Sequence, residues 1–143
     1  MIKSRALLQA VALTIASVAF GNVQGAKPPV KGNEPVVNAL MSRALADAPG
    51  KEVMMLTVVY PPGGADPVHR HDAHGFIYVL EGSIVMGVKG AGERILVPGD
   101  TFYEGPADVH TVGRNASATR PAKFLVFLLK EQAKPAVIID PQL

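Results

Sequence analysis

The stretch GGADPVHRHDAHGFIYVLEG, residues 63–82, places three of the chain's four histidines directly before a run of β-forming residues. Side chains alternate across a strand, so His69 and His71, with one residue between them, are expected to point to the same face. Two imidazoles placed in this way can converge on one metal ion at about 2.0–2.1 Å each. The spacing alone also fits a pair of surface histidines on an exposed strand.

The chain on both sides of this stretch is typical of short strands separated by turns. Apolar and β-branched runs, bounded by Pro and Gly clusters, predict strands at residues 52–60, 76–81, 83–88, 94–97, 101–104, 108–112 and 123–130. Residues 36–46 stay ambiguous, because their apolar positions fit a helical stripe while Val36 and Val37 also fit the start of a strand. This pattern indicates an all-β sandwich or barrel.

The first 25 residues have the layout of a secretory signal peptide. A basic start with Lys3 and Arg5 precedes an apolar run over residues 6–20, and small residues lead to an expected cleavage site after Gly25. Removing Lys3 and Arg5 from the 14 basic residues leaves 12, which equals the 12 acidic residues. We therefore expect a periplasmic or secreted protein, with no membrane association after cleavage. The absence of a basic stripe argues against a nucleic-acid partner.

A third metal ligand has to come from another strand, and His110 is the only histidine left outside the first stretch. It lies in GDTFYEGPADVHTVGRN, residues 99–115. Together the two stretches resemble the two motifs of the cupin superfamily. Gly63, His69, His71 and Gly82 match the first motif, and Gly99 and His110 match the second.

The resemblance implies a cupin jelly-roll β-barrel of roughly eight strands in two sheets, with a divalent metal in its mouth, a small-molecule ligand or substrate, and a homodimer. We divide the chain into a signal peptide (1–25), an N-terminal arm and first element (26–50), a barrel domain (51–133) and a C-terminal tail (134–143).

The departures from the cupin motifs concern the metal site. The family's metal-binding Glu belongs at position 75 or 76, where this chain has Gly75 and Phe76. The Pro and Gly of the second motif are displaced to Gly105-Pro106-Ala107, and the motif Asn falls on Arg114, with Asn115 one place later. Without a hard anionic oxygen among the ligands, we expect Fe, Zn, Ni or Cu rather than Mn.

Two residues are candidates to replace the missing Glu. His74 lies one position before it, but a bend would be needed because its parity relative to His71 is wrong for a continuous strand. Glu104 precedes His110 by six residues. We expect it at most to hydrogen-bond to a metal ligand without binding the metal itself. Tyr78 and Tyr103 are candidates to line the pocket. No catalytic acid or base can be identified.

Two classes of function remain. The resemblance to cupins implies either a metal-dependent dioxygenase, isomerase, lyase or decarboxylase acting on a small organic acid, sugar acid or phenolic, or a non-catalytic module that binds a metal or small ligand. A transcription regulator would need a DNA-binding segment, for which the expected mature chain has no room.

Overall fold

The structure is a computed structural model that describes residues 32–139, which form nine β-strands. In chain order they are β1 (Val36–Ala44), β2 (Lys51–Tyr60), β3 (His69–Arg70), β4 (Ala73–Glu81), β5 (Ile84–Val88), β6 (Arg94–Leu96), β7 (Thr101–Glu104), β8 (Val109–Asn115) and β9 (Ala122–Glu131). The predicted signal peptide lies outside the described residues. Within them, no helix has the length and apolar character needed to cross a membrane.

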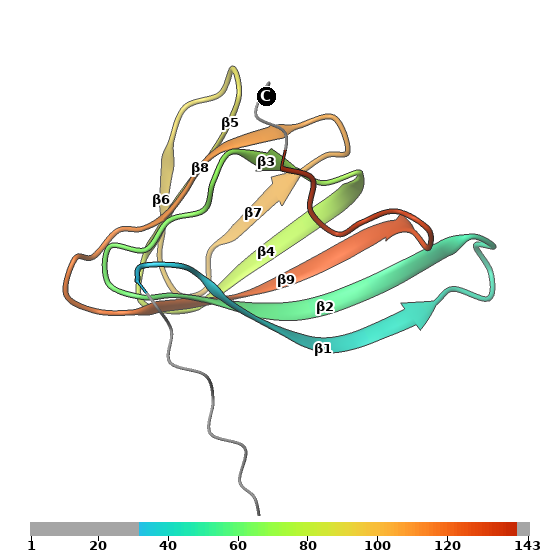
Figure 1. Ribbon diagram of the computed structural model, residues 1–143, viewed down its shortest axis with the longest axis horizontal. Helices are drawn as coiled ribbons and strands as arrows, with labels where there is room; N and C mark the ends of the chain where they lie inside the picture. Colours follow the sequence, from blue (N-terminus) through green and yellow to red (C-terminus); the bar gives the residue numbers. More distant parts are fainter. Residues whose placement is uncertain (1–31, 140–143) are drawn as a thin grey trace, which may run out of the picture.

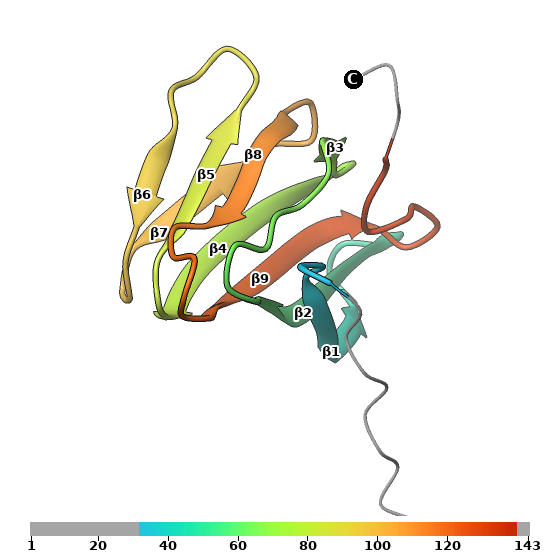
Figure 2. The ribbon, with the colours of Figure 1, turned by 60° about the vertical axis from the view of Figure 1, so that its left-hand side comes forward.

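The strands form two antiparallel sheets that pack face to face (Figures 1 and 2). The larger sheet has the order β1-β2-β9-β4-β7, and the smaller has the order β3-β8-β5-β6. The ambiguous N-terminal segment is a strand, β1, which pairs with β2 at the edge of the larger sheet. The predicted all-β jelly roll is therefore confirmed.

Alternation of side chains along the strands builds the inner face of the larger sheet. In β4, Ala73, Gly75, Ile77 and Val79 are buried, whereas the residues between them are exposed. Strand β9 repeats this pattern with every second residue from Ala122 to Lys130 buried. These inward apolar side chains meet those of β5 and β6 in one core between the sheets.

Gly82, at the turn between β4 and β5, can only be a glycine. Its φ of 71° lies in the left-handed region. A Cβ there would lie 2.6 Å from the Pro121 carbonyl oxygen and 2.8 Å from the Ala122 Cα. The chain can therefore turn from one sheet into the other only by passing directly against the start of β9.

A β-bulge in β8 explains why the motif Asn stands one residue late. Along β5, Gly87 pairs with Val112 but the next residue, Val88, pairs with His110, so Thr111 has no partner in the register. This extra residue shifts Asn115 by one position in sequence. The side chain of Asn115 is buried and donates to the carbonyl oxygens of Tyr60, Pro61 and Arg120 at 3.3, 3.0 and 2.7 Å. Asn115 thus ties β8 to the end of β2 and to the loop before β9.

Replacing Asn115 with Ala should destabilise the fold by about 2–4 kcal/mol, because it removes three hydrogen bonds that join β8 to the end of β2 and to the loop before β9. Urea unfolding followed by circular dichroism measures this change. Asn38→Ala on exposed strand β1 is the matched control and should change the free energy of unfolding by less than about 0.5 kcal/mol. Equal effects of the two substitutions would show that Asn115 does not hold the loops together.

Candidate metal centre

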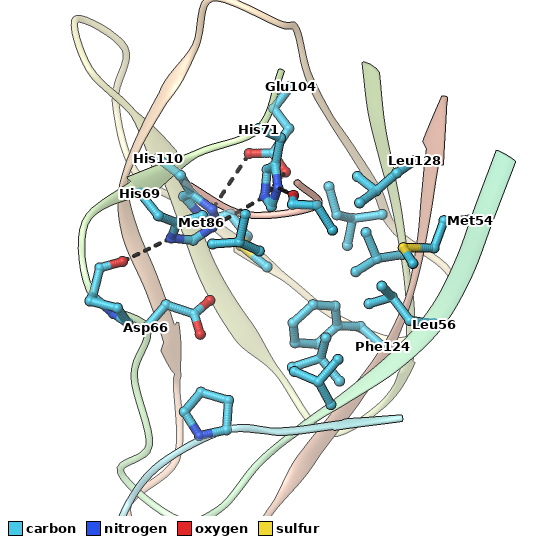
Figure 3. A pocket seen from close by; sticks show the side chains of 18 of the residues that line it. Met54, Leu56, Asp66, His69, His71, Met86, Glu104, His110, Phe124 and Leu128 are labelled. Atoms are coloured by element: carbon cyan, nitrogen blue, oxygen red, sulfur yellow. Dashed lines mark hydrogen bonds and ion pairs between the residues drawn. The ribbon is translucent and has the colours of Figure 1, made fainter. Parts of the chain in front are cut away.

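Three histidines meet at one end of the space between the sheets (Figure 3). His69 lies in β3, His71 follows that strand directly, and His110 lies in β8, where it is the register partner of His69. All three are buried, and one nitrogen of each lies within 4.8 Å of the others. The structure thus brings together the three histidines chosen from the sequence.

Backbone carbonyls orient two of these rings. The Nδ1 of His69 contacts the Pro67 carbonyl oxygen at 2.8 Å, and the Nδ1 of His71 contacts the carbonyl oxygen of Ala136. A carbonyl oxygen only accepts, so each Nδ1 must carry the proton. In a neutral ring the lone pair is then on Nε2, which is the arrangement found in metal-binding histidines.

The electron-rich atoms of the cluster therefore face one another. The Nε2 atoms of His69 and His71 lie 3.2 Å apart, and the Nε2 of His71 lies 3.3 Å from Oε1 of Glu104. Lone pairs at these distances repel unless a cation, either a proton or a metal ion, lies among them. The cluster has the chemistry of a cation site.

Burial affects the charges of the other two groups. It raises the pKa of Glu104 to about 7 and lowers the pKa of His110 to about 4, so His110 is neutral near pH 7. Oε2 of Glu104 and both ring nitrogens of His110 are buried and have no hydrogen-bond partner among residues 32–139. Such atoms are rare in folded proteins, because an unpaired buried polar group is costly. A divalent ion held by His69, His71 and His110 would give the cluster its missing partner.

Three other residues predicted for the site, His74, Tyr78 and Tyr103, lie elsewhere. His74 is exposed on the outer face of β4, and its Nδ1 lies 2.8 Å from the hydroxyl of Tyr103. Tyr78 and Tyr103 are exposed on the same outer face, in a separate hollow beside Phe76. None of the three is among the residues that line the cavity at the histidines. Glu104, by contrast, is buried among the histidines and contacts two of them.

The sequence analysis did not identify Asp66 and Tyr60, a hydrogen-bonded pair next to the histidines. Asp66 lines the cavity and accepts a hydrogen bond from the hydroxyl of the buried Tyr60. Burial raises the pKa of Asp66, against the opposing effect of this hydrogen bond. A Cβ at Gly113 would lie 2.9 Å from Oδ2 of Asp66, 2.9 Å from the Tyr60 hydroxyl and 3.2 Å from Cε1 of His110. Asp66, Tyr60 and His110 therefore lie around the same point in space. The only sign of this in the sequence is the position of Asp66 just before the His-x-His pair.

The cavity beside the histidine cluster has a volume of about 390 Å³ and is mostly apolar. Figure 3 shows the histidines, Glu104 and Asp66 together at one end, with apolar side chains such as Phe124 and Leu128 facing them. The lining residues Val37, Val137 and Ile139 are exposed and mark the cavity mouth, between β1 and the segment after β9. The site can hold a small molecule with one polar end.

The family model described as a cupin domain matches residues 56–128, which include all three histidines and Glu104. The chain belongs to the cupin family. A search of curated protein sequences found no match.

Solved structures of cupin-like enzymes resemble this cupin. It is 25% identical to an oxalate oxidase in complex with glycolate, with a TM-score of 0.60, covering 77% of this chain and 57% of the oxidase. A DMSP lyase from Ruegeria pomeroyi is also 25% identical, with a TM-score of 0.53, covering 61% of this chain and 42% of the lyase. A polyketide cyclase from Streptomyces resistomycificus is 23% identical, with a TM-score of 0.56 and coverage of 73% and 69%. The cupin thus spans about half the length of the first two enzymes.

Replacing His110 with Ala should abolish retention of Zn²⁺ or Co²⁺ through dialysis, because it removes one of three converging nitrogens. His74→Ala is the matched control and should retain the metal fully, since His74 lies on the outer face. Elemental analysis of the dialysed proteins measures both. Full occupancy in the His110 variant would mean that the ion binds elsewhere.

The segment after β9 should contribute to metal affinity through its contact with His71. Ending the chain at Lys134 removes the Ala136 carbonyl that holds the His71 ring, whereas ending it at Ile139 keeps that carbonyl. Loss of such an outer hydrogen bond typically weakens metal binding about 10–100-fold. Competition with a chromophoric chelator measures the affinity. Equal Zn²⁺ affinity of the two shortened chains would show that the contact is dispensable.

Proposed function

We propose that this cupin is a metal-dependent enzyme that moves a proton on a small, largely apolar organic acid or phenolic. The single observation that supports this is the division of the cavity, in which every strongly polar side chain lies at one end. A substrate with one carboxylate or phenolate head and an apolar body matches this division. A sugar acid fits poorly, because the apolar end offers no partners for several hydroxyl groups.

The metal-binding residues of the site are His69, His71 and His110. A bound divalent ion supplies Lewis acidity, which makes a hydrogen next to a bound carbonyl group more acidic. The three imidazoles face the polar end of the cavity and so fix where the head of the substrate lies. Apolar side chains line the rest of the cavity and would surround the apolar part of the substrate, which keeps water away from it.

Asp66 is the residue proposed to move the proton. Its Oδ2 accepts the hydrogen bond from Tyr60, which fixes the carboxylate at the cavity wall and leaves Oδ1 to take a proton from the substrate. Its backbone N–H also donates to the Gly113 carbonyl oxygen at 2.8 Å, so the main chain is held as well. A fixed carboxylate near a metal site suits an isomerase, lyase or cyclase better than a dioxygenase. The DMSP lyase among the similar structures agrees with this assignment.

Hydrogen exchange tests the proposal before the natural substrate is identified. Metal-loaded protein is incubated in D₂O with 4-methyl-2-oxopentanoate, an apolar 2-oxo acid, and deuterium at C3 is followed by NMR. We expect exchange above the rate given by the free metal ion, and a loss of about 100-fold or more in Asp66→Asn. Asp47→Asn, at the exposed turn after β1, is the matched control and should exchange like the unmodified protein.

Two results would contradict the proposal. Faster exchange with 2-oxogluconate than with the apolar acid would overturn the substrate class. Tight binding of the acid with no exchange above the free-metal rate would instead support a non-catalytic binding module.

A further inference from the structure

Gly75 and Glu104 lie directly opposite each other, on the paired strands β4 and β7. Both face the interior and are buried. A Cβ at Gly75 would lie 2.8 Å from Cγ of Glu104 and 2.9 Å from its Oε1. Contacts this short do not occur between real side chains, so the side chain of Glu104 occupies the space that a residue at position 75 would need. Position 75 is also a place where the cupin motif carries its metal-binding Glu.

The carboxylate of Glu104 lies at ligand distances from the histidines (Figure 3). Its Oε1 is 3.3 Å from Nε2 of His71, and its Oε2 is 3.5 Å from Nδ1 of His110. The separation of the His69 and His71 Nε2 atoms is similar, at 3.2 Å. Atoms bound at 2.0–2.2 Å to one ion, in tetrahedral or octahedral geometry, lie roughly 2.8–3.6 Å apart. The contacts of Glu104 with His71 and His110 therefore fall in the range expected for neighbouring ligands of one ion, beside a histidine cluster whose nitrogens lie within 4.8 Å of one another.

Among the described residues, the Glu104 carboxylate lacks a full set of partners. Glu104 is only 3% exposed, and its Oε2 has no hydrogen-bond partner. In the part of the chain that the structure describes, neither lysine nor arginine forms an ion pair with it. A buried carboxylate without a cation is strongly disfavoured, whereas one that binds a metal ion is not.

We propose that Glu104 is the fourth protein ligand of the metal, and that it supplies from β7 the carboxylate that the cupin motif supplies from β4. The glycine at position 75 leaves room for it. This inference rests on the metal centre of the proposed function and adds a residue to it. A carboxylate ligand brings back a hard anionic oxygen, so the expectation against Mn²⁺ drawn from the sequence loses its basis.

Metal affinity of the full chain tests the assignment without any substrate. The dissociation constants for Mn²⁺ and Zn²⁺ are measured by chelator competition for the unmodified protein, Glu104→Gln and Glu81→Gln. Glu104→Gln should weaken Mn²⁺ binding by more than about tenfold, with a smaller loss for Zn²⁺, because the amide keeps the shape but removes the anionic ligand. Glu81→Gln removes one exposed carboxylate at the end of β4 and should leave both constants unchanged. A loss below tenfold for Mn²⁺ in Glu104→Gln would overturn the proposal.

Moving the carboxylate back to β4 gives a second and independent test. Glu104→Gly should lose Mn²⁺ affinity, and adding Gly75→Glu to it should restore the affinity to within about tenfold of the unmodified protein. Gly75→Glu alone should bind poorly, because two side chains then compete for one space. Thermal unfolding of each metal-free variant shows that it folds. A folded double variant without recovered affinity would mean that Glu104 acts only through packing.

The outcome separates this inference from the proposed function. If Glu104→Gln binds Mn²⁺ normally while His110→Ala does not, the three-histidine centre stands and the fourth ligand is wrong. If Glu104→Gln loses the metal but the loaded protein exchanges no hydrogen, the ligand is right and the enzymatic proposal is wrong.

Discussion

The site depends on the repulsion among electron-rich atoms buried together. Two carbonyl oxygens fix the protons of His69 and His71 on Nδ1, which turns both Nε2 lone pairs into the same small space. Glu104 adds carboxylate oxygens there, and burial makes solvent screening weak. The arrangement is costly without a positive charge and favourable around one. The jelly roll keeps these acceptors together: β8, which carries His110, is paired on both sides, and the edge strands β3 and β7 are held by β8 and β4.

Much of the fold and the three histidines of the candidate metal site could be predicted from the sequence, because they follow from local pattern. Alternating apolar residues marked β2, β4 and β9, and the single residue between His69 and His71 set their common direction. The position of His74 also followed from parity, since an odd step from His71 puts it on the outer face of β4. Residues 36–46, which the sequence left open between helix and strand, include strand β1 because β2 offers a pairing partner. This is a tertiary effect that local sequence does not encode.

The sequence made Glu104 a candidate but could not show that it lies against the histidines, because that depends on register. Gly75 and Glu104 are 29 positions apart in the chain, and only the pairing of β4 with β7 puts them side by side. The displaced Asn115 is a similar case, since the bulge at Thr111 corrects for it and no local signal predicts a bulge. Asp66 and Tyr60 meet through the connection between β2 and β3, which lies outside the strands. A sequence motif compares positions along the chain, whereas a metal site depends on which side chains lie close together in the folded protein.

The segment after β9 returns across the molecule to β3 (Figures 1 and 2). Ile138 exchanges two backbone hydrogen bonds with Arg70, and Ala136 holds the ring of His71. Local opening of this short segment would therefore release the His71 ring while the strands of both sheets stay paired. The geometry of the site can thus be lost without unfolding of the barrel.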